Sequence, residues 1–226
     1  MTRPGTIGVL SSDLARYADF SVALMHCQTP PGSKLIWTKG ADVVGNMNRM
    51  YRGMEGDWLW IMGDDHVFDS DLLLRLLEHD VDVVVPHCLK RMPPYDPVVY
   101  SGEAGEDHAG HPVYVGNTDM PKAGLVPVHA CGSAGMLVRR HVFEALEKLP
   151  GEMFRSHGGL NEDLTFCADL REAGFQIYCD PSALLGHIAL VSVWPEFRDG
   201  AWQIQLDLGN GVMMPVQRYL REEVLA

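Results

Sequence analysis

The sequence is short of basic residues. It has 18 lysine and arginine residues against 30 aspartate and glutamate residues, which gives a formal net charge of −12 at pH 7. A protein of this charge repels the phosphate backbone of nucleic acids and the headgroups of anionic lipids. We therefore do not expect nucleic acid as the main ligand, although a local basic patch could still meet a charged acceptor.

Paired cysteines are absent as well. The five cysteines are odd in number and scattered, and no two have the Cys-x-x-Cys spacing that is typical of zinc sites and redox couples. They are Cys27, Cys88, Cys131, Cys167 and Cys179. We expect reduced thiols, most of them buried.

The sequence also lacks a segment suited to a membrane. The uncharged stretch at residues 181–195 is too short for a transmembrane helix and is bounded by prolines. Residues 1–5 lead directly into a strand-like segment, without the apolar stretch and cleavage site of a signal peptide. We expect a cytoplasmic protein that does not bind membranes.

The composition is that of a folded protein, with 46% hydrophobic and 21% charged residues in a chain of 226. This length suits one large domain, residues 1–226. Within it we expect a nucleotide-binding half at about residues 1–90, an acceptor-binding and catalytic half at about residues 91–190, and a tail at residues 191–226.

Strand-like and helix-like segments alternate along the first half of the chain. Short apolar runs are typical of buried strands, and apolar residues at helical spacing are typical of amphipathic helices. The predicted strands are residues 6–12, 34–38, 57–62 and 81–86, and the predicted helices are residues 13–27, 41–54 and 72–79. This alternation predicts an α/β fold with a mostly parallel central sheet flanked by helices.

The second half has a more mixed pattern. Prolines, glycines and short alternating segments at residues 89–128 predict a smaller antiparallel β portion that faces the acceptor. Helices at residues 141–148 and 162–173 and a strand at residues 176–179 follow, and the tail ends in an amphipathic helix. For the tail aromatics we expect core packing or a dimer contact, with a lid or stacking on an acceptor sugar as the alternative. These aromatics are Trp194, Phe197 and Trp202.

The most hydrophobic strand ends in consecutive acids. Residues 58–62 read Trp-Leu-Trp-Ile-Met, as expected of a central strand buried on both faces, and Asp64, Asp65 and His66 follow shortly after. Open α/β sheets bind their ligands at the carboxyl ends of the strands. Alternate residues of an extended segment face the same side, so Asp64 and His66 could share one ion, Mn²⁺ or Mg²⁺. Asp65 would then face the ribose or make a supporting hydrogen bond.

A structural role for these acids is the alternative. Asp64 and Asp65 could cap the helix that follows, as acids often do. Asp69 and Ser70 already supply a cap for that helix, however, and the strand ends abruptly. The pattern therefore favours metal binding.

Two further motifs lie in the second half. Glu162 and Asp163 follow a pair of glycines at a predicted helix start, which suits general-base work on an acceptor hydroxyl. Acids in a first helical turn also complement the helix dipole, which is the alternative. His187 follows a predicted strand and could complete the coordination begun by Asp64 and His66, the alternative being a structural histidine.

Together these motifs resemble the GT-A glycosyltransferases, especially the family-2-type group, and in the metal motif the polypeptide N-acetylgalactosaminyltransferases. The resemblance covers residues 6–187 and implies a single GT-A (Rossmann-like) domain. Residues 58–66 are similar to the strand and Asp-x-Asp or Asp-x-His signature of that superfamily. This similarity implies Asp64 and His66 as metal ligands, with Asp65 as the alternative ligand.

The resemblance extends to the other motifs. Residues 161–163 are similar to the motif whose aspartate is the base in inverting members, which implies that role for Asp163 with Glu162 beside it. His187 falls where the family has its downstream metal-binding histidine. Residues 131–140 are similar to the segment of small residues that lines the donor sugar, here Gly132, Ser133, Ala134 and Gly135.

The resemblance implies a hexosyltransferase that uses a nucleotide-sugar, with a UDP-sugar as the first expectation. The acceptor hydroxyl could belong to a glycan, a protein or a small molecule. One alternative is a sugar nucleotidyltransferase, but a basic glycine-rich loop is missing after the first strand, where Ser11, Ser12 and Asp13 stand. A non-catalytic nucleotide-sugar-binding protein is the other alternative.

Overall fold

The computed structural model describes residues 2–11, 17–40, 42–198 and 200–216. The helices are α1 (Ala18–His26), α2 (Val43–Gly53), α3 (Leu72–Glu78), α4 (Arg140–Leu146) and α5 (Glu162–Glu172). The strands of the first half are β1 (Thr6–Leu10), β2 (Lys34–Thr38), β3 (Trp58–Gly63), β4 (His66–Phe68) and β5 (Val83–Cys88). The strands of the second half are β6 (Val99–Glu106), β7 (Pro112–Gly116), β8 (Val126–Val128), β9 (Ala130–Cys131), β10 (Met136–Arg139), β11 (Ile177–His187), β12 (Ser192–Arg198), β13 (Ala201–Asp207) and β14 (Met213–Val216).

The central sheet has the strand order β2-β1-β3-β10-β5-β11-β4, with β8 paired to β11. Strands β1, β2, β3, β5 and β11 run in one direction, because β10 is antiparallel to both β3 and β5. Strands β10, β4 and β8 run the other way. The predicted α/β class with a mostly parallel central sheet is therefore confirmed.

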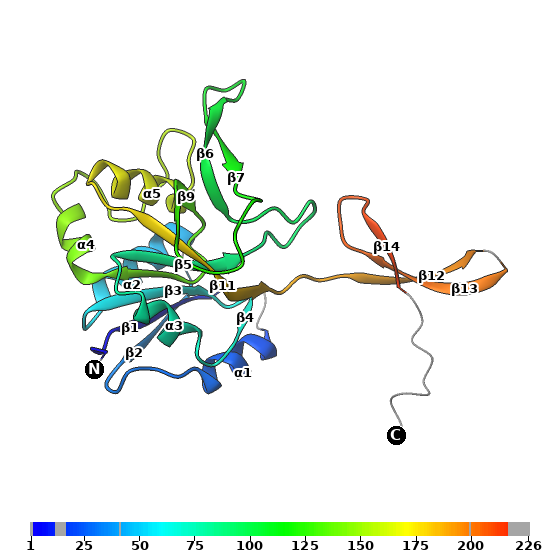
Figure 1. Cartoon of the computed structure of the whole chain (residues 1–226), viewed down its shortest axis with the longest axis horizontal. Helices are drawn as coiled ribbons and strands as arrows, with labels where there is room; N and C mark the ends of the chain where they lie inside the picture. Colours follow the sequence, from blue (N-terminus) through cyan, green and yellow to red (C-terminus); the bar gives the residue numbers. More distant parts are fainter. Residues whose placement is uncertain (1, 12–16, 41, 199, 217–226) are drawn as a thin grey trace.

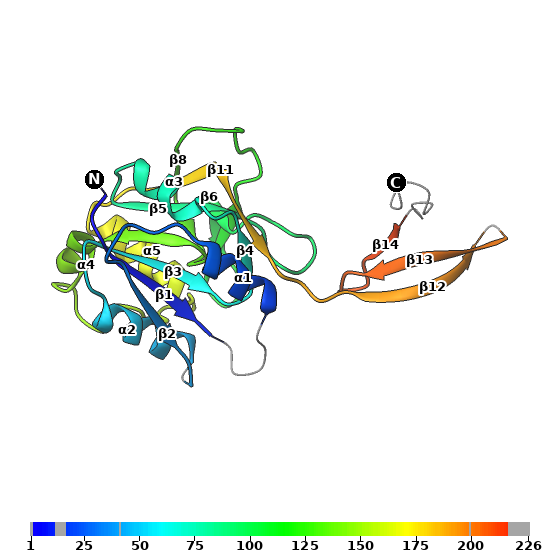
Figure 2. The same cartoon turned by 90° about the horizontal axis from the view of Figure 1, so that it is seen from below.

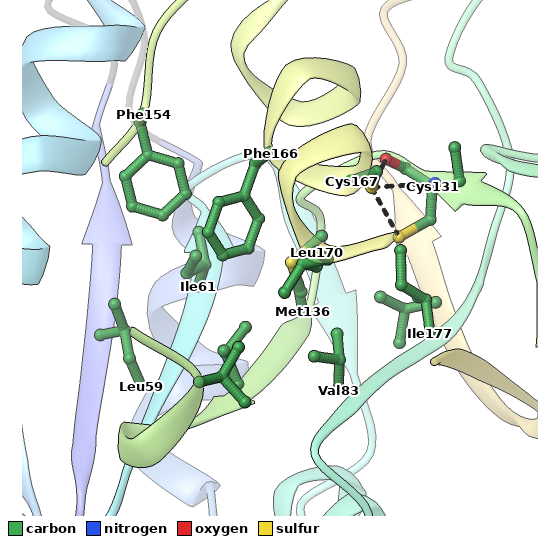
Figure 3. Close-up of a cluster of buried hydrophobic side chains, with 14 of the residues drawn as sticks. Leu59, Ile61, Val83, Cys131, Met136, Phe154, Phe166, Cys167, Leu170 and Ile177 are labelled. Atoms are coloured by element: carbon green, nitrogen blue, oxygen red, sulfur yellow. Dashed lines mark hydrogen bonds between the residues drawn. The ribbon is translucent and has the colours of Figure 1, made fainter. Parts of the chain in front are cut away.

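Helices cover both faces of this sheet, α2, α4 and α5 on one side and α1 and α3 on the other (Figures 1 and 2). The pleat of β3 explains why its sequence is apolar at every position. Leu59 and Ile61 belong to the core under α5, whereas Trp58, Trp60 and Met62 belong to the core under α3. Figure 3 shows Leu59 and Ile61 beside Phe154 and Phe166.

The indole nitrogens of the two tryptophans in β3 are satisfied by backbone carbonyls. Nε1 of Trp60 donates to the carbonyl oxygen of Gly135 over 3.0 Å, and Nε1 of Trp58 donates to that of Arg3 over 2.9 Å. Gly135 has a positive φ of 70°, and a Cβ there would lie 2.5 Å from Pro86. The turn before β10 therefore needs a glycine at this position.

Several predicted element ends differ from the structure. The helix predicted at residues 72–79 corresponds to α3, but its N-cap residue is Asp71 and makes no side-chain capping bond. The cap expected from Asp69 and Ser70 is therefore wrong, because Ser70 instead accepts a hydrogen bond from Gln28. Residues 12–16 and residue 41, which the predicted first strand, first helix and second helix include, lie outside the described part of the chain.

Strand β11 is much longer than the strand predicted at residues 176–179. It pairs with β5 up to Asp180, shifts register, and resumes the pairing with Leu184 opposite His87 and Leu185 opposite Cys88. Its last residues pair with β4, so that His187 lies opposite His66. Pro181 lies within this irregular stretch, and because proline is rare inside strands, the sequence pattern did not predict that the strand continues.

The antiparallel portion is confirmed between residues 99 and 131, where β6 pairs with β7 and β9. The tail differs from the prediction, because β12, β13 and β14 form a three-stranded sheet that projects from the rest of the molecule (Figure 1). Trp194 and Phe197 are 56% and 61% exposed, so the expected core packing of these two side chains is wrong. The predicted terminal helix and the side chain of Trp202 lie outside the described residues.

Among the described residues, none of the helices has both the length and the apolar character needed to span a lipid bilayer.

Candidate functional site

The acidic turn after β3 lies at the carboxyl edge of the central sheet. Strand β3 ends at Gly63, and β4 begins at His66 and pairs with the end of β11. The rings of His66 and His187 stack with their centroids 4.5 Å apart. Two histidines that are far apart in the sequence are thus brought together by strand pairing.

Asp65 contacts both of these imidazole rings. One of its carboxylate oxygens lies 3.0 Å from Nδ1 of His66, and the other lies 3.2 Å from Nε2 of His187. Arg91 also donates to the second oxygen over 3.0 Å. Asp65 is therefore the acid of the turn that joins the two histidines.

The hydrogen bonds of the two rings fix their orientation. Nδ1 of His66 lies 3.2 Å from the carbonyl oxygen of Gly63, and Nδ1 of His187 lies 3.1 Å from that of Leu89. Within the described part of the chain, Nε2 of His66 is buried and has no hydrogen-bond partner. A buried nitrogen without a partner is unfavourable unless something binds it, and a metal ion suits a neutral imidazole nitrogen.

A thiol completes this group. Ligand atoms of His66, Cys88 and His187 all lie within 4.8 Å of one another. Cys88 is 1% exposed and ends β5, the neighbour of β11 in the sheet. Cys88 was expected only as a buried thiol, and its position at the carboxyl end of a parallel strand is the signal that could have marked it.

The electrostatics of this group favour a charged network. Burial alone would raise the pKa of Asp65, but the hydrogen bonds from His187 and His66 outweigh it and hold the pKa well below its usual range. Burial alone would lower the pKa of each histidine, but Asp65 outweighs it and raises the pKa of His66 to about 9 and that of His187 to about 10. For Cys88, burial opposes ionisation, and the adjacent His187 and His66 lower the pKa of the thiol overall.

Asp64 takes part in a different contact. Its side chain is 5% exposed and accepts a hydrogen bond from Oγ of Ser11 over 2.6 Å. Ser11 directly follows β1, and the backbone nitrogen of Asp64 donates to the carbonyl oxygen of Leu10. The two acids of the turn thus point to different neighbours, Asp64 to the end of β1 and Asp65 to the histidines. Neither makes the helix cap that was the structural alternative, since α3 has no side-chain capping bond.

The segment of small residues, Gly132–Gly135, runs from the side of Asp163 to the strands β5 and β11. At one end, a Cβ on Gly132 would lie 3.6 Å from Oδ2 of Asp163. At the other end, a Cβ on Gly135 would lie 2.5 Å from Pro86 and 3.1 Å from Leu185, which belong to the strands that carry Cys88 and His187. Between them, the carbonyl oxygen of Ser133 accepts a hydrogen bond from the nitrogen of Met136, and Ala134 is half-buried.

Glu162 and Asp163 open helix α5, as predicted. Asp163 accepts a hydrogen bond from the backbone nitrogen of Leu164 over 2.8 Å. Burial, followed by the charge of Glu162, raises the pKa of Asp163 from 3.8 to about 6. A carboxyl of this kind takes up and releases a proton close to neutral pH, which a residue that only complements the helix dipole does not require.

A small cavity of about 330 Å³ adjoins the histidine pair. Lys90, Arg91 and His187 line it, and among the described residues along its wall none is acidic. Both cations are paired with acids outside this wall, Arg91 with Asp65 over 3.0 Å and Lys90 with Asp96 over 3.7 Å. The pattern of the sequence did not single out Lys90 and Arg91, since they stand alone in a loop.

A family model described as glycosyltransferase-like family 2 matches residues 28–205. No curated protein sequence matches the chain.

Two solved structures are similar to this chain. The crystal structure of GalNAc-T7 with UDP, GalNAc and Mn²⁺ superposes with a TM-score of 0.56 at 10% identity, over 81% of this chain and 43% of GalNAc-T7. The crystal structure of A197 from STIV superposes with a TM-score of 0.48 at 17% identity, over 95% of this chain and 99% of that protein. The chain thus covers less than half of GalNAc-T7, and the similarity to it is one of fold.

Proposed function

The chain belongs to the glycosyltransferase-like family 2, and on this premise we propose that it is a metal-dependent enzyme that transfers a hexose from a nucleotide-sugar, in the first instance a UDP-sugar, to an acceptor hydroxyl. The observation that carries the proposal is the contact of Asp65 with both His66 and His187 at the carboxyl edge of a GT-A sheet. In open α/β folds this edge is the place where ligands bind.

The metal site that we propose contains His66 and His187 as ligands. Of the two acids, the alternative Asp65 replaces Asp64, which is hydrogen-bonded to Ser11. Asp65 orients the ring of His66 through Nδ1 and places a carboxylate beside the ion. The buried, unpartnered Nε2 of His66 in the described structure supports this assignment. Imidazole and carboxylate groups suit Mn²⁺ better than Mg²⁺, which prefers oxygen ligands. When bound, the ion would neutralise charge on the departing diphosphate. GalNAc-T7, which is similar in fold, contains Mn²⁺ together with UDP in its crystal structure.

The donor site that we propose lies between the end of β1 and the small-residue segment. Asp64 would bind the donor on the side of Ser11, with which it already forms a hydrogen bond. Gly132–Gly135 would line the sugar, since Gly132 lies beside Asp163 and carries no side chain there. Lys90 and Arg91 in the adjoining cavity would attract the diphosphate.

Asp163 is the base in our proposed mechanism, with Glu162 beside it. As the acceptor oxygen attacks the anomeric carbon, its proton would pass to a carboxylate oxygen of Asp163. A carboxyl whose pKa is about 6 suits a base that works near neutral pH, which supports inversion of configuration. The anomeric proton of the product, observed by NMR, tests this point, because retention would leave Glu162 and Asp163 as residues that position the acceptor.

We propose that residues 1–226 act as one glycosyltransferase domain in the cytoplasm, with a nucleotide-sugar donor and a glycan, protein or small-molecule acceptor as partners. All five cysteines are free in the structure, which suits a reducing compartment.

The proposal is tested first by calorimetric binding of nucleoside diphosphates and their sugars, with and without Mn²⁺. We expect one nucleotide to bind the wild type only with the metal, and to bind neither Asp64→Ala nor His66→Ala. The control is Asp69→Asn, an exposed acid between β4 and α3 that should bind like the wild type. Thermal unfolding of each variant checks that the fold is retained. Absence of binding by every nucleotide would overturn the proposal.

Turnover separates the two alternative functions. A glycosyltransferase releases the nucleoside diphosphate when an acceptor is added, whereas a sugar nucleotidyltransferase releases pyrophosphate from a nucleoside triphosphate and a sugar phosphate. Metal-dependent binding without release of either product, over a broad panel of acceptors, would favour a non-catalytic nucleotide-sugar-binding protein.

A further inference from the structure

We propose that Cys88 is a third ligand of the metal ion and that its sulfur gives the site a preference for Zn²⁺ and Co²⁺ over Mg²⁺. The inference deepens the proposed function, because it concerns the same ion. It starts from the positions of three side chains on neighbouring strands.

Strands β5, β11 and β4 are consecutive in the sheet and contribute one side chain each. Cys88 ends β5 and lies opposite Leu185 of β11, two residues before His187. His187 in turn lies opposite His66, the first residue of β4. The backbone pairing therefore fixes the three side chains relative to one another without help from a loop.

The spacing of the ligand atoms is close to that of a metal site. Ligand atoms of His66, Cys88 and His187 lie within 4.8 Å of one another. Bond lengths of about 2.3 Å for zinc to sulfur and about 2.0–2.1 Å for zinc to nitrogen place ligand atoms about 3.3–3.6 Å apart in a tetrahedron. Side-chain rotations that shift these atoms by about an ångström would form the site.

Each histidine has an oxygen partner at Nδ1, as metal-binding histidines often do. In each ring Nδ1 faces an oxygen atom, that of Asp65 or Gly63 for His66 and that of Leu89 for His187. For His66 such bonds leave Nε2 for the ion, whereas Nε2 of His187 also lies 3.2 Å from an oxygen of Asp65, so His187 would exchange that contact for the ion. Within the described residues, Nε2 of His66 is buried without a hydrogen-bond partner, and a bound ion would satisfy it.

A buried cysteine often serves only as a small apolar side chain. The other buried cysteines of this chain fit that role, since Cys131 and Cys167 contact each other 3.9 Å apart within the apolar core (Figure 3). Cys88 differs from them because two imidazole rings lie next to its sulfur. Metal binding would convert its thiol to a thiolate and release the proton to solvent.

Sulfur and nitrogen ligands determine which ion the site prefers. Thiolate is a soft ligand that favours Zn²⁺ and Co²⁺, whereas Mg²⁺ prefers oxygen ligands. Three protein ligands also leave a position open for a diphosphate oxygen, as in catalytic zinc sites. Mn²⁺ should bind more weakly than Co²⁺ at the same site.

The test is a titration of metal-free protein with Co²⁺, followed by absorption spectroscopy. We expect the wild type to show a thiolate-to-cobalt charge-transfer band in the near ultraviolet, and Cys88→Ser to lack it. Competition with Zn²⁺ should show that Cys88→Ser binds zinc about 100-fold more weakly, since even residues that only orient ligands contribute 10- to 100-fold. The matched control is Cys27→Ser, a half-buried cysteine outside the group, which should keep both the band and the affinity.

X-ray absorption of the zinc-loaded wild type provides a second measurement that needs no variant. We expect one sulfur at about 2.3 Å from the zinc. A shell of nitrogen and oxygen atoms alone, or an unchanged cobalt spectrum in Cys88→Ser, would overturn the inference.

Binding of UDP in the presence of Mn²⁺, measured in parallel, keeps the two proposals apart. Metal-dependent UDP binding without sulfur at the metal would show that Cys88 is not a ligand, and the proposed function would still hold. Zinc bound through sulfur in a protein that binds no nucleotide would support Cys88 as a ligand and contradict the proposed function.

Discussion

The two acidic motifs of this protein look alike in sequence and differ in structure. Asp64-Asp65 and Glu162-Asp163 are both pairs of adjacent acids that follow a glycine within a few residues. In the folded chain Asp65 lies between two histidines that hold its pKa well below the usual range, whereas burial and Glu162 raise the pKa of Asp163 to about 6. Acids whose environments move their pKa values apart are suited to different roles, one to binding cations and one to moving a proton.

The largest effect should follow from removing a histidine on the metal side. His66→Ala takes away a buried ring that contacts Asp65 and stacks on His187. We expect metal-dependent nucleotide binding to be lost and transfer to fall by about 1000-fold or more, since a metal ion contributes several kcal/mol at developing phosphate charge. Calorimetry and an assay of nucleoside diphosphate release measure the two effects. Metal-dependent nucleotide binding at the wild-type level by this variant would show that His66 is not a metal ligand.

A smaller and more selective effect is expected on the base side. Asp163→Asn should lower kcat by about 100-fold and leave Mn²⁺-dependent nucleotide binding unchanged. Asp163→Glu, tested beside it, should recover part of kcat if a carboxylate is what the step needs. Equal losses of kcat and donor affinity would assign Asp163 to donor binding instead.

The pH dependence of kcat should reflect the same acid. The base must be ionised, so kcat should fall as the pH drops through the pKa of about 6. Between about pH 7 and about pH 5 we expect a loss of roughly tenfold, which Asp163→Asn should abolish. A kcat that is constant over this pH range would show that Asp163 is not the base.

The ionised form of Asp163, which the reaction needs, should lower the stability of the fold. The raised pKa means that the folded state prefers the protonated form, so ionisation of Asp163 destabilises the fold fully above about 6 and not below the ordinary value of 3.8. Asp163→Asn should therefore raise the free energy of unfolding by about 1–2 kcal/mol at neutral pH. The difference should vanish below the ordinary pKa, where both proteins are neutral at this position. Denaturant unfolding at two pH values measures it.

The smallest effect is expected from the projecting sheet β12-β13-β14. It touches the rest of the chain near Tyr95, whose hydroxyl donates to the carbonyl oxygen of Leu208 over 3.3 Å. Removing the residues after Leu190 should leave donor binding within about twofold of the wild type, because neither acidic motif lies in the projecting sheet. Acceptor transfer by the same truncated protein tests whether the exposed Trp194 and Phe197 form a lid, since unchanged transfer would exclude that role.

How far the sequence predicted the site is clearest at single residues. Asp163 was placed at a helix start from the glycines and acids around it, and that local feature was correct. His187 was expected beside His66, and strand pairing brings them together. Cys88 was not expected there, because no local pattern connects it with either histidine. The sequence did not predict the different partners of Asp64 and Asp65 either. Both acids lie in a tight turn between β3 and β4, where side chains do not alternate strictly between two sides.

The sequence by itself determined the α/β class and the buried central strand, because hydrophobic periodicity and strand ends are local properties of the chain. It also placed acids at the carboxyl edge of the sheet. Only the tertiary structure decided which side chains meet there. The pairing of β11 with β4 aligns His187 with His66, and the shifted pairing of β11 with β5 sets Cys88 opposite Leu185, so the group depends on pairings between distant segments. Such pairings are set by the packing of the whole sheet, which no short window of sequence contains.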